Sequence, residues 1–195
     1  MLKELVLATH NHAKILELKA MLSPYAVQVF SAEEFNLDEP EETGRTFQDN
    51  ALIKAKYTAR MTGKPALSDD SGICFPALNN FPGVDTAPFR KSFDTLDQCF
   101  QDLKKRLDAT ADYRAFFHSS LCLYFPDDSY QFFEGTIHGQ FVYPVRGDST
   151  KGYHFDIVFQ PDGYDQTYAQ LGIDIKNKIS HRHQSFGAFL RTCFP

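Results

Sequence analysis

Short apolar runs and helical repeats alternate through the first third of the chain. Residues 5–8 form an unbroken apolar run, which is typical of a short buried strand in a parallel sheet. Apolar residues at helical spacing then predict a helix over 13–22. Val27 and Val29 have polar neighbours and predict a second strand. An acidic, irregular stretch at 36–44 follows.

The pattern resumes at Thr46. Thr46 and Asp49 resemble a capping box, so we expect a helix over 46–61. Residues 66–68 predict another short strand, which should stop at the aspartates that follow. The later segments are expected to be a helix over 95–107, an antiparallel hairpin or meander over 113–142, a strand near 155–159, a helical turn at 167–171 and a helix over 181–191 capped by Ser180. This order predicts an α/β fold with an elongated mixed sheet flanked by helices, in a single domain over residues 1–195.

Composition and charge narrow the classes of partner. The chain has 195 residues, of which 43% are hydrophobic and 14% aromatic, so it can bury a core and is not disordered in bulk. Its formal net charge is −5 and its pI is near 5.8, which argues against a nucleic-acid polymer or an anionic membrane as partner. No apolar run reaches the roughly 18 residues that a membrane span needs, and the apolar N-terminal run is too short for a signal peptide. We therefore expect a cytoplasmic protein.

The cysteines indicate packing rather than chemistry. Cys74, Cys99, Cys122 and Cys193 form no CxxC pair, and each lies among apolar residues. Buried free thiols are the favoured interpretation, with disulfides or a zinc site as the alternatives.

Polar residues gather at the ends of predicted strands, where α/β sheets usually bind their substrates. In residues 9–14, a strand gives way to a helix whose free N–H groups favour an anion, and Thr9, Asn11 and Lys14 could hold phosphate oxygens. The glycines of a P-loop or a dinucleotide motif are missing. Taken alone, this segment could equally be an ordinary polar turn.

Two acidic clusters could bind a metal ion or activate water beside the phosphates. A carboxylate at Glu41 or Glu42 could bind Mg²⁺ while Lys54, on one helical face with Asn50, meets phosphate; the alternative is a solvated loop. In residues 68–72 the adjacent aspartates point opposite ways in an extended chain, so one can activate water or bind metal; the alternative is a turn with side-chain-to-backbone hydrogen bonds.

Basic residues also open the last predicted helix. His181 and Arg182 fall in its first turn, where the helix dipole disfavours cations unless an anionic or polar ligand lies nearby. A solvated helix start is the alternative.

The ordered set of motifs is more specific than any member. The motifs are Thr9-x-Asn11-x-x-Lys14, Glu41-Glu42-Thr43-Gly44, Phe47-x-x-Asn50-Ala51-x-x-Lys54-Ala55, Ser68-Asp69-Asp70-Ser71-Gly72, Thr167-x-Ala169-x-Leu171 and Ser180-His181-Arg182. In this order and spacing the chain resembles the inosine triphosphate pyrophosphatase family over nearly its whole length. The resemblance implies a mixed α/β sheet with two lobes around a central cleft, and a homodimer. It implies Mg²⁺-dependent hydrolysis of deaminated purine nucleoside triphosphates (ITP, dITP, XTP) to monophosphate and pyrophosphate, which removes them from the nucleotide pool.

The resemblance also assigns roles to residues. Asp70 and Lys14 would be catalytic, with Asp70 as general base. Glu41 and Asp70 would bind Mg²⁺, with Glu42 as a helper and Asp69 as a structural neighbour. The residues expected to bind substrate are Thr9, His10, Asn11, His12, Ala13, Lys14, Lys54, Ser71, Tyr153, His154, Phe155, Asp156, Lys176, His181 and Arg182.

The chain departs from the family in the segment expected to meet the base. The family's Gly-Phe-Gly-Tyr-Asp-Pro is Gly152-Tyr153-His154-Phe155-Asp156-Ile157 here, so His154 replaces a glycine. Two alternatives follow: the same chemistry on another base, or a nucleotide-binding protein that keeps the fold without catalysis.

Overall fold

A computed structural model describes residues 2–150 and 153–195; Gly152 of the altered segment lies outside the described residues. The strands are β1 (Glu4–Leu7), β2 (Gln28–Ser31), β3 (Ala66–Phe75), β4 (Phe81–Pro82), β5 (Arg114–Tyr124), β6 (Tyr130–Phe141) and β7 (Phe159–Pro161). The α-helices are α1 (His12–Leu22), α2 (Phe47–Thr62), α3 (Thr86–Lys91), α4 (Leu96–Asp108), α5 (Tyr168–Leu171), α6 (Ile173–Ile179) and α7 (His181–Cys193).

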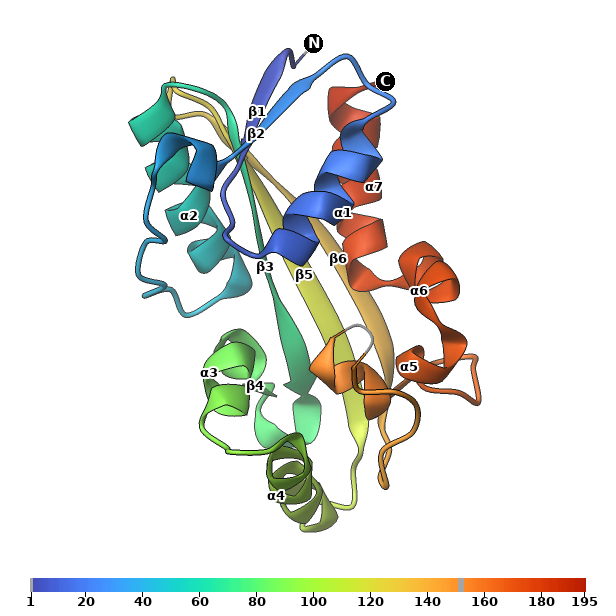
Figure 1. Cartoon of the computed structure of the whole chain (residues 1–195). Coiled ribbons are helices and arrows are strands. Elements are labelled where there is room, and N and C mark those ends of the chain that lie inside the picture. The colour runs from blue at the N-terminus through green and yellow to red at the C-terminus, as the bar shows by residue number, and fades with distance from the viewer. Residues whose placement is uncertain (1, 151–152) are drawn as a thin grey trace. The chain divides into compact units, whose positions relative to one another are not determined.

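The described residues form a seven-stranded mixed sheet flanked by helices (Figure 1). The strand order is β2-β1-β3-β5-β6-β7, with β4 paired to β3. β1 is parallel to both β2 and β3, whereas β4 and β7 run antiparallel to their neighbours. The predicted fold class, a mixed α/β sheet, is confirmed. No helix in the described ranges is long and apolar enough to cross a membrane.

Contacts divide the described chain into two compact units. Unit 1 comprises residues 1–70, 120–134 and 185–195, and unit 2 comprises 71–119 and 135–184. Each is described by itself, and a single domain over 1–195 stays a prediction, as do the lobes around a cleft.

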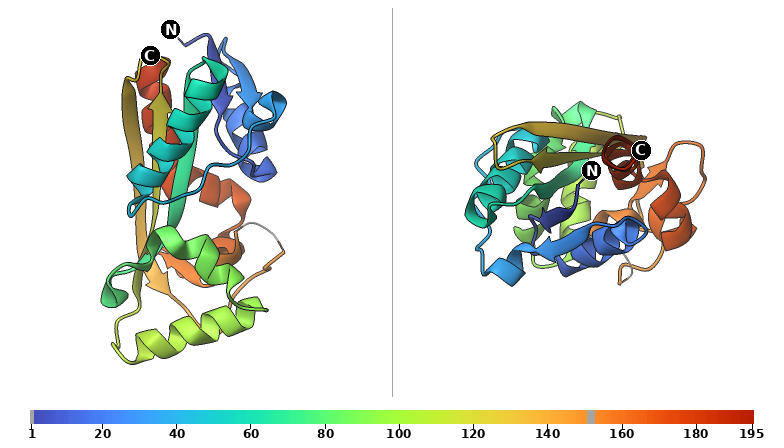
Figure 2. Two further views of the ribbon diagram at one scale, coloured as in Figure 1. Left: turned by 90° about the vertical axis from the view of Figure 1, so that its left-hand side faces the viewer. Right: turned by 90° about the horizontal axis from the view of Figure 1, so that it is seen from above.

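Unit 1 is a three-layer arrangement around its part of the sheet. Leu67, Leu121 and Leu123 pack with α1 and α7 on one face, while Ala66, Cys122 and Tyr124 pack with α2 on the other. Figure 2 shows α2 and the α1–α7 pair on opposite sides of these strands. Successive residues of β3 and β5 therefore face different helices, as strand geometry requires.

Unit 2 has an aromatic core. Residues of β3, α4 and β5 pack with the segment 153–159 and α5; the largest buried side chains here are Phe75, Phe100, Phe117, Phe155, Phe159 and Tyr168. Phe117 of β5 lies near its centre, with its ring centroid 4.7 Å from that of Phe159.

Most predicted elements are confirmed, and two are wrong. The helix over 46–61 begins with the predicted capping box of Thr46 and Asp49 and ends at Gly63, whose φ is +66°. Strand β3 does not stop at the aspartates but continues to Phe75. Residues 154–157 form a 3₁₀ turn rather than a strand, because the Asp156 side chain accepts from the backbone N–H of Tyr153.

The cysteines are free thiols, and Cys74, Cys99 and Cys122 are buried. Burial raises the pKa of Cys74 and Cys122 to about 12 and that of Cys99 to about 11. Because the thiolate is the reactive form, we expect Ellman's reagent at pH 8 to label only Cys193 in the native protein and every cysteine in guanidinium chloride. Rapid native labelling of the buried thiols would contradict this packing.

Candidate functional site

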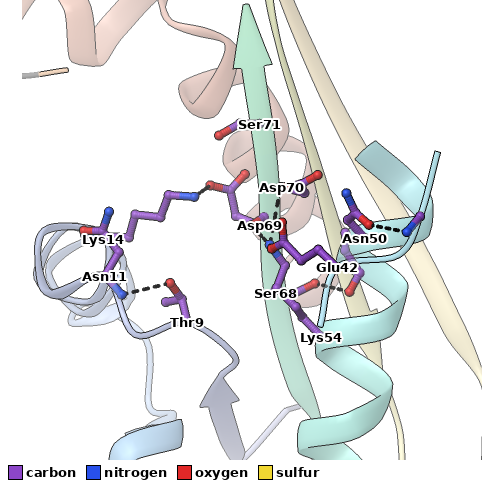
Figure 3. Close-up of polar contacts among 12 residues, drawn as sticks. Thr9, Asn11, Lys14, Glu42, Asn50, Lys54, Ser68, Asp69, Asp70 and Ser71 are labelled. Atoms are coloured by element: carbon purple, nitrogen blue, oxygen red, sulfur yellow. Dashed lines mark hydrogen bonds and ion pairs between the residues drawn. The ribbon is translucent and has the colours of Figure 1, made fainter. Parts of the chain in front are cut away.

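Strand β3 presents its two aspartates to different helices. Ser68 and Asp70 point toward α2, where the Ser68 hydroxyl donates to the Ala51 carbonyl at 2.6 Å. Asp69 points the other way, and its Oδ2 lies 2.7 Å from the Lys14 Nζ of α1 (Figure 3). The alternation of side chains along an extended chain explains this split, and both carboxylates are buried.

Lys54 is the hub of the polar cluster in unit 1. Its Nζ lies 2.7 Å from Glu42 Oε1 and 3.4 Å from Asp70 Oδ1, and it donates to the Asp69 carbonyl at 3.0 Å. Helix α2 carries Lys54 on its buried face, only 5% exposed. A lysine so deeply buried requires carboxylate partners, and here it has them.

The electrostatics of this cluster favour one more cation. Burial by itself lowers the pKa of Lys54, but Asp70, Glu42 and Asp69 outweigh it, and the pKa is raised above 10.5. Burial raises the pKa of Asp70, the nearby Glu42 and Asp69 add to the rise, and Lys54 and Lys14 oppose it. Three carboxylates, of Glu42, Asp69 and Asp70, meet the two lysines Lys14 and Lys54, so one negative charge is left without a cation when all five groups are ionised.

The turn between β1 and α1 is shaped by its own side chains. Thr9 Oγ1 accepts from the Asn11 N–H at 3.2 Å, and Asn11 Oδ1 accepts from the Lys14 N–H at 3.2 Å, as in a helix cap. Lys14 lies in the first turn of α1, and its side chain extends to Asp69. His10 turns away and hydrogen-bonds through Nε2 to the Leu37 carbonyl at 2.7 Å.

The other residues of this turn have different surroundings. His12 is exposed, and its Nε2 lies 3.8 Å from Glu33 Oε1. Ala13 lies in α1. That the turn binds substrate stays a prediction for all of these residues.

The acidic segment brings Glu42, rather than Glu41, to Lys54. Both glutamates are exposed, and Glu42 forms the 2.7 Å ion pair with Lys54. The end of this segment is fixed by Asn50, whose Oδ1 accepts from the Gly44 N–H at 2.8 Å. Glu41 as a metal ligand stays a prediction, and the contacts favour its neighbour.

Gly44 permits this close approach of the loop to α2. An added Cβ would lie 2.5 Å from Asn50 Oδ1 and 2.9 Å from the Asn50 backbone nitrogen. We expect Gly44→Ala to destabilise the protein by about 1–3 kcal/mol in urea unfolding, as overpacking does. Gly187→Ala is the control, because its methyl would meet only the flexible Arg191 guanidinium, at 3.2 Å, inside helix α7. Equal stability of the two variants would contradict the close approach of Gly44 to Asn50.

In unit 2, α7 begins beside Ser71. Ser180 caps the helix by accepting from the His183 N–H at 3.2 Å, as predicted. An Arg182 Nη donates to Ser71 Oγ at 3.0 Å, and the ring of buried His181 stacks on Phe117 with centroids 5.0 Å apart. The structure thus brings together three of the expected substrate residues, Ser71, His181 and Arg182.

A buried ion pair supports the altered segment 153–157. Asp156 Oδ2 pairs with Lys176 Nζ and accepts from the Tyr153 N–H at 3.0 Å. His154 is exposed beside Tyr153. Phe155 is 1% exposed, and its ring packs edge-on against Phe100 with 5.4 Å between centroids, so its side chain belongs to the core; that Phe155 binds substrate stays a prediction.

The donors around Asp70 fit a hard divalent cation. Asp70 Oδ2 is buried and has no hydrogen-bond partner, and the Asp70 and Glu42 carboxylates share Lys54 Nζ as a partner. Over residues 2–150 and 153–195, no three His, Cys, Asp or Glu side chains form a metal-binding group. Mg²⁺ commonly binds one or two carboxylates and completes its shell with phosphate and water, so this donor set suits it better than a closed cage would.

Sequence reasoning missed several contributors. Phe117, which stacks on His181, lies within a Phe-rich strand where nothing marks one ring as special. The link from His10 to Leu37 joins residues far apart in sequence. Asn50 is placed on the same helical face as Lys54 by its spacing, but its hydrogen bond to Gly44 is not foreseen.

Comparisons with known proteins agree with the motifs. Residues 5–192 match the Ham1 family. A dITP/XTP pyrophosphatase of Gluconobacter oxydans is 42% identical over 190 residues, covering 97% of this chain and 90% of the relative, and one of Agrobacterium fabrum is 40% identical, covering 98% and 96%. Among solved structures, a HAM1 protein from Coxiella burnetii has a TM-score of 0.90 at 34% identity and covers 98% of both chains. Since these matches run nearly from end to end, the chain belongs to the Ham1 family.

Proposed function

We propose that this protein hydrolyses deaminated purine nucleoside triphosphates, namely dITP, XTP and ITP, to the monophosphate and pyrophosphate. The observation that carries the proposal is the cluster in which buried Lys54 pairs with Glu42 and Asp70, next to the Lys14–Asp69 pair. Relatives about 40% identical over nearly the full chain are named dITP/XTP pyrophosphatases, which supports the same reaction here.

The lysines hold the triphosphate in this proposal. Lys14 and Lys54 are paired with carboxylates in the absence of substrate, so their charges are already positioned near Asp69 and Asp70. Phosphate oxygens would replace those carboxylates as partners, and Glu42 and Asp70 would then hold Mg²⁺. The metal would offset the negative charge of the phosphates.

Asp70 receives the proton of the attacking water. A new bond forms between that water's oxygen and the α-phosphorus, and the bond to the bridging oxygen breaks as pyrophosphate leaves. The raised pKa of Asp70, caused first by burial, strengthens it as a base. Lys14 and Lys54 stabilise the charge that develops on the departing group.

The residues of unit 2 contact the purine in this proposal. Lys176, held by Asp156, and Arg182, held by Ser71, are cationic donors suited to the 6-oxo group that distinguishes deaminated purines. Tyr153, His154 and His181 supply rings beside them.

The test is a substrate panel with pyrophosphate as the readout. Purified protein is incubated with dITP, XTP, ITP, dATP, dGTP and dUTP, with Mg²⁺ or with EDTA. We expect the kcat/KM for pyrophosphate release from the deaminated purines to exceed that for the other nucleotides by at least about 10²-fold. Turnover led by another base would overturn the substrate assignment, and turnover in EDTA would overturn the role of Mg²⁺.

A homodimer in the cytoplasm completes the proposal. The large apolar side chain of Leu16 on α1 is 71% exposed, and a second copy would bury it. Free cysteines suit a reducing compartment. Sedimentation equilibrium tests the dimer, and a monomer mass at micromolar concentration would contradict it.

A further inference from the structure

The acidic segment that presents Glu42 has an electrostatic problem. Asp38, Glu39, Glu41 and Glu42 lie within five successive residues, outside any helix or strand. Like charges so close together repel, and a segment without regular structure has little to resist them. Something else must hold Glu42 where Lys54 meets it.

Two side chains from other parts of the chain hydrogen-bond to the ends of the segment. At Gly44 the tie is Asn50 of α2, which is 2% exposed. At Leu37 the tie is His10, whose Nε2 lies 2.7 Å from the Leu37 carbonyl oxygen. Glu42 therefore lies in a short segment that is anchored by hydrogen bonds at Leu37 and at Gly44.

The environment of His10 defines how it acts. A carbonyl oxygen can only accept, so Nε2 is the nitrogen that carries the proton. Nδ1 is buried and has no hydrogen-bond partner. The ring's donor is thus engaged with the Leu37 carbonyl, so His10 supports the segment at this point.

We propose that His10 is a positioning residue that joins the Lys14 turn to the acidic segment and thereby sets the affinity of the Glu42–Asp70 pair for the divalent cation. The inference rests on the proposed function, because it takes those carboxylates as the metal ligands. Groups that orient metal ligands typically change metal affinity by about 10- to 100-fold when removed.

The test separates metal affinity from catalysis and from folding. In His10→Ala the segment loses its tie at Leu37, and we expect the Mg²⁺ concentration for half-maximal rate to rise about 10-fold or more, with kcat at saturating Mg²⁺ within about 3-fold of wild type. Mn²⁺ binding, followed by electron paramagnetic resonance in the presence of a methylene-bridged dITP analogue, should weaken by the same factor. This second readout requires no turnover.

Two further variants make the result specific. His10→Gln keeps an amide donor at the reach of Nε2 and should restore metal affinity to within about 3-fold of wild type. His138→Ala removes an exposed imidazole from β6 and should change nothing. Unchanged Mn²⁺ affinity in His10→Ala, or equal loss in His10→Gln, would overturn the role of the hydrogen bond. A wild-type protein that hydrolyses no deaminated purine triphosphate would instead overturn the proposed function.

Discussion

Asp70→Asn is expected to lower kcat by at least about 10²-fold while leaving the fold intact, because the amide can neither take the proton of water nor bind Mg²⁺ as a carboxylate does. The substitution preserves size and leaves Lys54 with its 2.7 Å partner Glu42. Single-turnover release of pyrophosphate from dITP measures the loss.

The stability of this variant should move in the other direction. Burial, the largest cause, raises the pKa of Asp70 above 3.8, so the protonated form is favoured in the fold. The associated stability is present at low pH and is lost as the pH rises through the folded pKa, so at pH 7 the carboxylate costs stability. We therefore expect the Tm of the metal-free variant to equal or exceed that of wild type.

Asp165→Asn is the matched control, since Asp165 is exposed and outside the cluster. It should leave both kcat and Tm unchanged. Activity in Asp70→Asn close to wild type would remove Asp70 from the chemistry, and a lowered Tm would show that loss of activity came from loss of structure. Such trade-offs between stability and activity are common where a site buries charge.

The same buried charges explain where the sequence misleads about the fold. Asp69 and Asp70 look like the end of a strand, because carboxylates seldom lie inside a sheet. Strand β3 nevertheless continues through them, since α1 and α2 supply Lys14 and Lys54 to their two faces. Those partners come from other elements, so local pattern could not reveal them.

Elements with local signals were predictable. Helix α2 carries its start in Thr46 and Asp49 and its end in Gly63. The segment 154–157 carries an apolar pattern typical of a strand, yet the hydrogen bond from the Tyr153 N–H to Asp156 closes it into a turn. Here a side-chain interaction overrides the local pattern.

The candidate site divides in the same way. Lys14 and Lys54 follow from their positions after a strand and on a helical face, whereas the choice of Asp70 over Asp69 comes from the family resemblance alone. The choice between Glu41 and Glu42 depends on which carboxylate the loop turns inward, and that is set by the ties at Leu37 and Gly44. Neighbouring glutamates are equivalent to sequence reasoning until those contacts are known.

Lys54→Met is expected to lower both the activity and the stability of the protein. The variant loses the cation that meets phosphate, and it leaves the carboxylates of Glu42 and Asp70 without the lysine that pairs with both. We expect kcat/KM for dITP to fall by at least about 10³-fold, because binding and charge stabilisation are lost together. Removing one partner of a buried ion pair typically costs about 3–5 kcal/mol, so urea unfolding should show a loss of about 3 kcal/mol at pH 7.

Lys54→Met should lower the stability of the fold at pH 7, whereas Asp70→Asn should leave it equal or raise it. The pKa of Lys54 is raised above 10.5 in the fold, because Asp70, Glu42 and Asp69 together outweigh the burial that lowers it. The stability that Lys54 confers is present below pH 10.5 and is lost as the pH rises through the folded pKa, so the stabilities of wild type and Lys54→Met should converge in strongly alkaline solution.

Lys105→Met, at an exposed position of α4, is the control and should have the stability of wild type at every pH. The double variant Lys54→Met/Asp70→Asn should be more stable than Lys54→Met alone, because it removes the carboxylate that the lysine had compensated. A double variant less stable than the single one would mean that packing of the lysine stem, rather than charge, holds α2 against β3.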